Sequence, residues 1–444
     1  FNGSLKKMHL ESNNIGGEGA SAIAKGIQEN KNCVLEELNL RSNKINVEGA
    51  KSLAEMIKVN ASLKKIYLGI NKIGDEGATA IAKGIQENKN CVLEELYLRE
   101  NEITVEGAKS LAEMIKVNAS LKKINLENAS LKKINLESNK IGDEGASAIA
   151  KGIQENKDCV LEELNLRGNE IKVEGAKSLA EMIKVNASLT YIRIKDFTLP
   201  IDDLKGETKK ERLDFSDESL VVQDAIIIAE CLKVNASLKN INLEKNEIVK
   251  SKYAKEDTLQ GESFDVGATV KHEGANWKIV KGKDIDGDYT IACFDGIKAI
   301  VNALKFNTSL KSINFSRNGI GDEGASAIAK GIQENKNCVL EELYLRENEI
   351  TVEGAKSLAE MIKVNASLKK INLESNKIGD EGASAIAKGI QENKNCVLEE
   401  LNLEYNAIKV EGAKSLAEMI KVNASLKSIN FENNNIGDDS DVNA

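Results

Sequence analysis

Apolar residues return at regular spacing along most of this 444-residue chain. The recurring pattern is L-x-x-[LI]-x-[LF]-x-x-N-x-I, which occurs for example at residues 35–45 and 63–73. Apolar and polar residues alternate within it, as in a strand with one buried face. Its third apolar position advances by 30 and then 28 residues, from Leu10 to Leu40 and on to Leu68. Two alternating units therefore form a repeating module of 58 residues.

Between the predicted strands, the apolar spacing changes to that of a helix. Ala50, Leu53, Ala54 and Ile57 lie at positions i, i+3, i+4 and i+7, and Lys51 is left for solvent. This spacing forms one apolar stripe along an amphipathic helix. Small residues fill two of the four stripe positions, which lets the helix lie close to a sheet. The sequence therefore predicts one strand and one helix in each unit.

These motifs closely resemble the ribonuclease-inhibitor-like class of leucine-rich repeats, which also alternates two long units. The resemblance implies an α/β solenoid of horseshoe shape, with a parallel β-sheet on the concave face and helices on the convex face. It also implies that the repeated Asn hydrogen-bonds neighbouring loop backbones and is structural rather than catalytic. The residues concerned are Asn43, Asn71, Asn101, Asn139, Asn169, Asn348, Asn376 and Asn406.

The resemblance covers nearly the whole chain and divides it into segments. Residues 195–214 show no helical stripe, so we expect an irregular charged loop that replaces a repeat helix. Residues 249–294 form an insertion whose alternating hydrophobicity and turn signals predict a small, three-stranded β element. Leucine-rich repeats are expected in the remaining segments, which are 1–194, 215–248 and 295–444, the last with an acidic C-terminal end.

Three aspartates in the insertion have two possible explanations. Asp284, Asp286 and Asp288 are spaced like the ligands of a calcium loop. Such a loop requires Gly at its sixth position, where this chain has Tyr289. We therefore favour a hairpin turn.

Ten residues of the chain occur twice in succession. Residues 118–127 are repeated letter for letter as residues 128–137, and each copy contains one predicted strand. A crossover between parallel strands needs about a dozen residues, and only Glu127–Ser130 separate these two. We predict that one copy joins the sheet and the other is extruded, without a function. The first residues match the interior of a repeat, so we also expect sequence upstream.

Predicted solvent-facing strand positions alternate in charge from one unit to the next. Neighbouring strands lie about 4.8 Å apart, so each Lys pair would fall between Glu pairs. The pattern forms either a charged groove for a partner or a cross-strand ladder of ion pairs. We favour the ladder, because like charges side by side are unfavourable. The pairs are Lys64-Lys65, Lys122-Lys123 and Lys369-Lys370 against Glu36-Glu37, Glu94-Glu95, Glu341-Glu342 and Glu399-Glu400.

Aromatic and Arg residues interrupt this charge pattern. Tyr67 and Tyr97 occupy the same position on adjacent predicted strands. Exposed Tyr often anchors interfaces, although single surface aromatics are also ordinary. The candidate partner-binding residues are Tyr67, Tyr97, Arg99, Tyr191, Tyr344, Arg346 and Trp277, the only Trp.

Composition narrows the function classes further. The net charge of −9 argues against nucleic acid as a partner, and no apolar run approaches the roughly 20 residues that cross a bilayer. The repeated Cys lack the spacing of disulfides or metal sites, which together with closely spaced N-A-S sequons favours a cytoplasmic protein. Only two His occur, and no catalytic or phosphate-binding motif is present. We therefore expect no enzyme activity, cofactor or metal.

The favoured function is a non-enzymatic, monomeric scaffold that binds protein partners. It would use the concave surface for binding and the segments 195–214 and 249–294 for specificity. The alternative is the regulatory region of a larger protein. Similar repeats occur in Ran GTPase-activating proteins and in the sensing region of NOD-like receptors.

Overall fold

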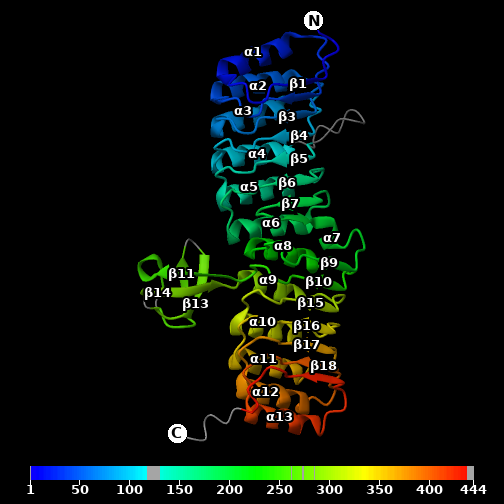
Figure 1. Ribbon diagram of the computed structural model, residues 1–444. Coiled ribbons are helices and arrows are strands. Elements are labelled where there is room, and N and C mark those ends of the chain that lie inside the picture. Colours follow the sequence, from blue (N-terminus) through cyan, green and yellow to red (C-terminus); the bar gives the residue numbers. More distant parts are fainter. Residues whose placement is uncertain (1, 118–130, 262, 273–274, 285, 438–444) are drawn as a thin grey trace. The chain divides into compact units, whose positions relative to one another are not determined.

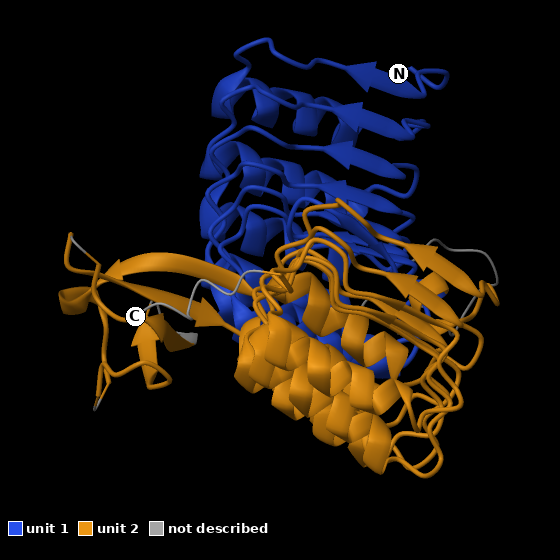
Figure 2. Ribbon diagram, turned by 60° about the horizontal axis from the view of Figure 1, so that its bottom comes forward, with its two compact units in different colours: residues 1–202 blue, residues 203–444 orange. Residues whose placement is uncertain are grey.

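Strands and helices alternate along the chain in its computed structural model (Figure 1). The chain divides into two compact units, residues 1–202 and 203–444, which are blue and orange in Figure 2. The described residues are 2–117, 131–261, 263–272, 275–284 and 286–437.

Unit 1 contains one sheet and the helices that return the chain between its strands. Its strands are Lys7–His9 (β1), Glu37–Asn39 (β2), Lys65–Tyr67 (β3), Glu95–Tyr97 (β4), Lys133–Asn135 (β5), Glu163–Asn165 (β6), Tyr191–Arg193 (β7) and Thr198–Pro200 (β8). Its helices are Gly16–Glu29 (α1), Val47–Val59 (α2), Gly74–Glu87 (α3), Val105–Val117 (α4), Gly142–Glu155 (α5) and Val173–Val185 (α6). The strands follow chain order in the sheet, with β1 to β7 parallel and β8 antiparallel to β7.

The alternating pattern decides which side of each strand is buried. The middle residues, such as Leu38, Ile66 and Leu96, are fully buried, and they pair with one another in register. The apolar stripes of the helices are buried as well, for example at Ala50 and Leu53. The first and third residues of each strand lie on the opposite side of the sheet, because side chains alternate along a strand. We call this side the open face.

The repeated Asn holds successive turns together at the ends of the strands. Asn71 is buried, and its Nδ2 donates to the carbonyl oxygens of Leu40 (3.1 Å) and Leu68 (2.9 Å). Its Oδ1 accepts hydrogen bonds from the backbone N–H groups of Asn43 (3.0 Å) and Ile45 (2.9 Å). One side chain thus satisfies buried backbone groups of two turns. The other seven Asn of this set are buried too: Asn43, Asn101, Asn139, Asn169, Asn348, Asn376 and Asn406.

Unit 2 contains a second parallel sheet, in the order β19-β18-β17-β16-β15-β10-β9. Its strands are Arg212–Asp214 (β9), Asn240–Asn242 (β10), Ser312–Asn314 (β15), Glu342–Tyr344 (β16), Lys370–Asn372 (β17), Glu400–Asn402 (β18) and Ser428–Asn430 (β19). Its helices include Val222–Leu232 (α8), Asp295–Leu304 (α9), Gly321–Glu334 (α10), Val352–Ile362 (α11), Gly379–Glu392 (α12) and Val410–Ile420 (α13). The predicted α/β solenoid with a parallel sheet and covering helices is confirmed.

The insertion at 249–294 contains one strand more than the three predicted. It comprises Lys250–Lys255 (β11), Thr269–His272 (β12), Ala275–Lys281 (β13) and Asp288–Cys293 (β14), with a short 3-10 helix at Glu256–Thr258 (η2). The strands form an antiparallel sheet in the order β11-β14-β13-β12. The sequence did not predict strand β11, because this edge strand buries only one residue, Ala254. Backbone pairing places it in the sheet, and its sequence shows no apolar alternation.

The aspartates of the insertion form the predicted hairpin turn. Asp284 Oδ1 accepts hydrogen bonds from the backbone N–H groups of Asp286 (3.0 Å) and Asp288 (2.9 Å). Gly287 in the same turn has φ +81°, a conformation that favours glycine. The turn joins β13 to β14.

The irregular loop predicted for 195–214 is wrong. This segment contains β8, a five-residue helix at Ile201–Lys205 (α7) and β9. Leu199, Ile201 and Leu204 are all buried. Three apolar residues are too few for the stripe of a full repeat helix, but they are enough to anchor one strand and one short helix.

The structure describes the second copy of the decamer from residue 131 onward. Residues 133–135 of that copy form β5, which pairs directly with β4, for example Leu96 with Ile134. The second copy therefore takes the register after β4. The first copy, 118–127, lies outside the described residues, and so does the prediction that it is extruded.

Candidate functional site on the open face of unit 1

Ion pairs run across the open face of unit 1. The Nζ atom of Lys65 lies 2.7 Å from Glu95 Oε1, and that of Lys133 lies 2.7 Å from Glu163 Oε1. In unit 2, Lys370 pairs with Glu400 in the same way, at 2.7 Å. The predicted charge ladder is thus confirmed. Lys122 and Lys123 lie outside the described residues, and their register is taken by Lys132 and Lys133.

Two tyrosines of the open face form a stack. The rings of Tyr67 on β3 and Tyr97 on β4 are nearly parallel, with centroids 4.5 Å apart. The Tyr97 hydroxyl donates a hydrogen bond to Glu95 Oε2 at 2.6 Å. Partial burial, and then this carboxylate, raise the pKa of Tyr97. The two nearly parallel rings form one continuous aromatic surface on the open face.

The ladder is interrupted at β7. At the first and third positions of this strand the chain has Tyr191 and Arg193, where β5 has Lys133 and Asn135. Tyr191 is 47% exposed. Glu163 therefore pairs with Lys133 on one side and faces an aromatic residue on the other. The last parallel strand of unit 1 thus differs in chemistry from the strands before it.

Arg193 differs from the other Arg residues of this face. Its Nε and Nη2 donate to the backbone oxygens of Lys195 (3.3 Å) and Asp196 (2.9 Å). Arg41, Arg99 and Arg167 each pair with at least one carboxylate. Among the residues that the structure describes, Arg193 has no carboxylate partner. A guanidinium has five N–H donors, so Arg193 keeps donors for an anion.

A hollow of about 170 Å³ opens between the tyrosines of β4 and β7. Its floor and walls come from β4 to β8, and β8 closes it at the antiparallel edge of the sheet. It combines aromatic walls, two amides, one ion pair and the guanidinium of Arg193. The polar lining residues are Tyr97, Lys133, Asn135, Glu163, Asn165, Tyr191, Arg193 and Thr198. We call it the β7 hollow.

A family model for the leucine-rich repeat matches eleven segments that make up more than half of the chain. The chain belongs to the leucine-rich repeat family. The segments are 1–24, 31–54, 59–82, 89–112, 127–150, 157–180, 306–329, 336–359, 364–387, 394–417 and 422–440.

Three solved structures are similar to this chain at low identity. A structure of the yeast Rad7 and Elc1 complex is 13% identical, with 94% of this chain and 76% of that chain covered and a TM-score of 0.30. An internalin from Listeria monocytogenes is 17% identical over 96% and 88%, with a TM-score of 0.31. Actin-binding site 2 of leiomodin-1 is 18% identical over 40% and 78%, with a TM-score of 0.24. Likeness at this level carries no inference about binding.

The predicted partner-binding residues of the leucine-rich repeats fall into three groups. Tyr97 and Tyr191 line the β7 hollow, and Tyr67 stacks on Tyr97. Arg99 follows the end of β4 and pairs with Glu100 at 2.7 Å. In unit 2, Tyr344 lies under Lys370, with 5.7 Å between Nζ and the ring centroid, and Arg346 pairs with Glu347 and Glu374.

Trp277 is not a surface anchor, which corrects its prediction as a partner-binding residue. Its side chain is 6% exposed and packs inside the small sheet of the insertion. The ring meets that of His272 edge-on at 6.2 Å, and Lys252 Nζ lies 5.1 Å from its centroid. The insertion has its own small core, in which Trp277 is buried together with Val270, Ile279, Tyr289 and Ile291.

Sequence reasoning missed Arg193, Asn165 and Thr198 as parts of the hollow. The available signal was the change in the repeat at 191–193, where Lys and Asn give way to Tyr and Arg. Within the described residues, no cluster of three or more His, Cys, Asp or Glu side chains is placed to hold a metal ion. No described helix is both long and apolar enough to cross a membrane.

Proposed function

We propose that this leucine-rich repeat protein is a non-enzymatic scaffold that binds a partner protein on the open face of unit 1. The single observation that carries the proposal is the β7 hollow. There the repeated ladder gives way to an exposed tyrosine and to an arginine without a carboxylate partner among the described residues.

The chemistry of the β7 hollow indicates what it would bind. A partner side chain would lie between Tyr97 and Tyr191, and a partner carboxylate would accept hydrogen bonds from Arg193. Tyr and Arg are the residues most enriched among energetic anchors of interfaces. Elsewhere on the face, Lys and Glu neutralise each other and would provide a polar rim. The binding energy would therefore concentrate at one end of the sheet.

The experiment compares point variants, because residues 195–214 contain buried elements and cannot be deleted safely. The 444-residue chain would be used to capture proteins from its source, and each captured protein would then be purified and titrated. We expect Tyr191→Ala and Arg193→Ala to weaken binding about tenfold or more. Tyr405→Ala, which removes an exposed tyrosine from unit 2, is the matched control. Partners that bind all variants equally would contradict the proposal.

The insertion is tested separately. If it determines specificity, a chain lacking residues 249–294 will lose partners that Arg193→Ala retains. Retention of every partner by this deletion would remove the insertion from the binding function.

We further propose that the protein works in the cytoplasm, for which the free thiols of all seven Cys are the support. The ribonuclease-inhibitor-like subclass and the regulatory alternative stay predictions. A GTPase assay with Ran tests the first regulatory form directly.

A further inference from the structure

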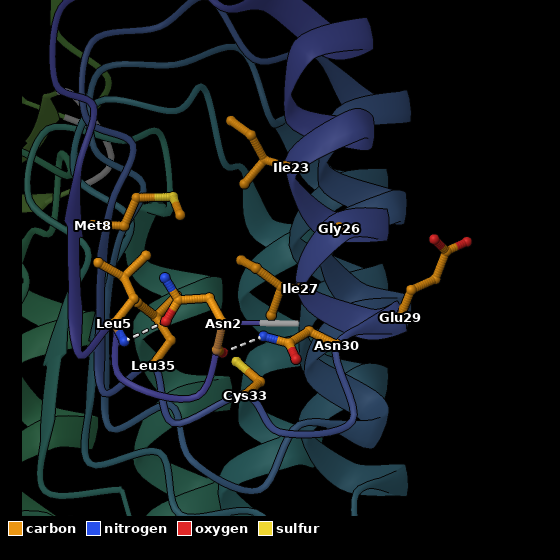
Figure 3. Close-up of a pocket in the computed structure, with 10 residues that line it drawn as sticks. All are labelled: Asn2, Leu5, Met8, Ile23, Gly26, Ile27, Glu29, Asn30, Cys33 and Leu35. Atoms are coloured by element: carbon orange, nitrogen blue, oxygen red, sulfur yellow. Dashed lines mark hydrogen bonds between the residues drawn. The ribbon is translucent and has the colours of Figure 1, made fainter.

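Two surfaces outside the β7 hollow differ from the rest of the repeat array. The first is an apolar hollow of about 440 Å³ between β1 and α1, lined among others by Leu5, Met8 and Ile23 (Figure 3). Because it borders the first residues of the sequence, we assign it no ligand. The second is the outer edge of strand β11 in the insertion, residues 250–255, which we call the β11 edge.

The two edges of the insertion sheet are covered differently. On one edge, the backbone N–H of Gln260 donates to the oxygen of Lys271 in β12 at 3.0 Å, and the N–H of Lys271 donates to the oxygen of Gln260 at 2.7 Å. On the other edge, β11 pairs with β14, and no described strand pairs with its outer side. Backbone hydrogen-bonding groups alternate between the two sides of a strand in an antiparallel sheet. Half of the residues of β11 therefore point these groups outward, where a further strand could pair with them.

The charge of β11 has a single sign. Its sequence, KSKYAK, contains three Lys and no acidic residue. Lys250 and Lys255 are exposed, and neither forms an ion pair with a carboxylate in the part of the chain that the structure describes. Lys252 lies over the ring of Trp277, with 5.1 Å between Nζ and the ring centroid. The Lys residues described above in the charge ladder, by contrast, each pair with a Glu of the neighbouring strand.

An aromatic side chain lies near the middle of the β11 edge. Tyr253 is 70% exposed, the highest value for a large apolar or aromatic side chain among the described residues. Its neighbour across the sheet is Thr290 of β14, and Lys281 of β13 follows Thr290 in the same row. Directly opposite residues on one face of a sheet contact each other. A strand added to β11 would therefore place one of its side chains against the Tyr253 ring.

Charge selects the strand that this edge would accept. A second copy of β11 would bring Lys against Lys, and like charges on paired strands are unfavourable. Lys on an edge strand thus opposes pairing between copies of the same protein. An acidic strand would instead be attracted. Repulsion alone does not require an exposed Tyr, which an acidic strand with an apolar residue at its centre would cover.

We propose that the β11 edge binds an extended acidic segment of a partner protein, which joins the insertion sheet as a fifth strand. Backbone hydrogen bonds to β11 would supply affinity, and the side chains of Lys250, Tyr253 and Lys255 would supply specificity. The proposal rests on the proposed role of the insertion in specificity and does not involve the β7 hollow.

The positions of the lysines determine the spacing within such a segment. Lys255 lies two residues after Tyr253, and Lys250 lies three residues before it. Residues of paired strands lie opposite one another one to one. An apolar residue opposite Tyr253 would thus have one carboxylate two positions away and another three positions away on its other side. The capped peptide EETVTEE contains these positions for either direction of the added strand.

The first test titrates capped peptides into the 15N-labelled 444-residue chain and follows its backbone amides by NMR. EETVTEE should shift the amides of residues 250–255 and leave those of β12 unchanged, whereas KKTVTKK should shift neither. Two forms of EETVTEE, each N-methylated at one of the two alternating sets of amides, test the backbone pairing. One form should bind, because its methyl groups point away from β11, and the other should not.

Three outcomes would overturn the proposal. One is the absence of any shift in the β11 amides at about 1 mM EETVTEE, a concentration at which weak contacts are still seen. The second is equal binding of the two N-methylated forms, which would exclude pairing of the backbones. The third is an equal effect of an oligothymidine, because β11 would then attract any polyanion.

The second test uses variants of the chain. Lys250→Glu combined with Lys255→Glu should weaken the binding of EETVTEE about tenfold, since two attractive pairs become repulsive. Lys271→Glu combined with Lys281→Glu is the matched control. These two residues are exposed in the same insertion but lie off the β11 edge, so this variant should bind as the wild type does. Equal weakening by the two double variants would contradict the proposal.

The indole signal of Trp277, the only Trp, should keep its position in each variant and so show that the insertion remains folded. The peptide titrations can fail while partners still depend on Tyr191 and Arg193, in which case only the strand addition is overturned. Loss of the β7 hollow as a binding site would, in turn, leave the peptide result unchanged.

Discussion

The repeated Asn offers a direct test of what holds the turns of the solenoid together. Asn376 is buried and makes five hydrogen bonds to the backbone of two turns. Its Nδ2 donates to three carbonyl oxygens, and its Oδ1 accepts from the N–H groups of Asn348 (3.1 Å) and Ile350 (3.0 Å). The substitution Asn376→Ala removes all five bonds and adds no bulk.

The expected loss follows from those bonds. A buried hydrogen bond contributes about 1 kcal/mol net, and an unpaired buried group costs about 1–3 kcal/mol. Five bonds would give about 5 kcal/mol, and a water molecule in the vacated space would recover one or two of them. We therefore expect Asn376→Ala to lower the free energy of unfolding by about 3–5 kcal/mol. Asn372→Ala is the matched control. It lies on the open face, where its Oδ1 accepts one hydrogen bond from the backbone N–H of Glu374, so we expect a loss of about 1 kcal/mol or less.

The assay is urea unfolding followed by circular dichroism, with the free energy taken from the linear extrapolation. Repeat arrays can unfold in blocks, so hydrogen exchange of the Asn348 and Ile350 amides gives a local measurement. Both amides should lose protection in Asn376→Ala and keep it in Asn372→Ala. Equal free energies for the two variants, with unchanged protection, would refute the claim that the buried Asn stabilises the turns.

Three further predictions concern packing and charge. Gly84→Ala should lower stability by about 2–3 kcal/mol in thermal unfolding, because its Cβ would clash with a backbone oxygen. Gly26→Ala should be neutral or stabilising, and equal effects of the two substitutions would contradict the packing argument. The raised pKa of Tyr97 means that the folded state holds the hydroxyl proton more tightly than the unfolded state. The stability that this proton contributes is therefore complete below about pH 10 and is lost as the pH rises through the folded pKa. Tyr97→Phe should flatten the loss of unfolding free energy at alkaline pH, and an unchanged dependence of stability on pH would refute this. Burial raises the pKa of Glu323, but hydrogen bonds from Lys278 at 2.6 Å and a second lysine outweigh it and lower the pKa. The attachment of the insertion should therefore weaken as acid protonates Glu323, and proteolysis of the insertion should become independent of pH in Glu323→Gln. A pH dependence that is unchanged in this variant would refute the role of Glu323.

Most of the repeat array could be predicted from local spacing. Each unit is one strand and one helix, and its apolar positions are set by periods of 2 and 3.6 residues that act within a few residues of the chain. The adjacency of Tyr67 and Tyr97 followed in the same way, because both occupy one slot of successive units. Prediction was wrong where the repeat stops. Strand β11 and the segment 195–214 are held by pairing and by a few buried residues, which produce no periodic signal.

The candidate site could likewise be predicted only in part from the sequence. The change at 191–193 was visible in the sequence, but an arginine becomes a binding group only if no carboxylate reaches it. That depends on neighbours from other strands, and on the backbone oxygens of Lys195 and Asp196 that orient Arg193. For the same reason Trp277 was wrongly predicted as an anchor, since its burial depends on neighbours from other strands, such as His272 of β12 and Lys252 of β11.

The sequence by itself determined the repeat, the parallel sheet and the buried face of each element, because these depend on which residue types recur at which spacing. Only the tertiary structure decided which copy of the doubled decamer pairs with β4, where the β7 hollow opens, and which glycines lie against a neighbouring helix. The 58-residue modules are almost identical in sequence, so their differences in function arise from what lies beside each one. Gly26 and Gly84 are equivalent positions of the same unit, and only the neighbouring helix α2 places Gly84 against a backbone oxygen.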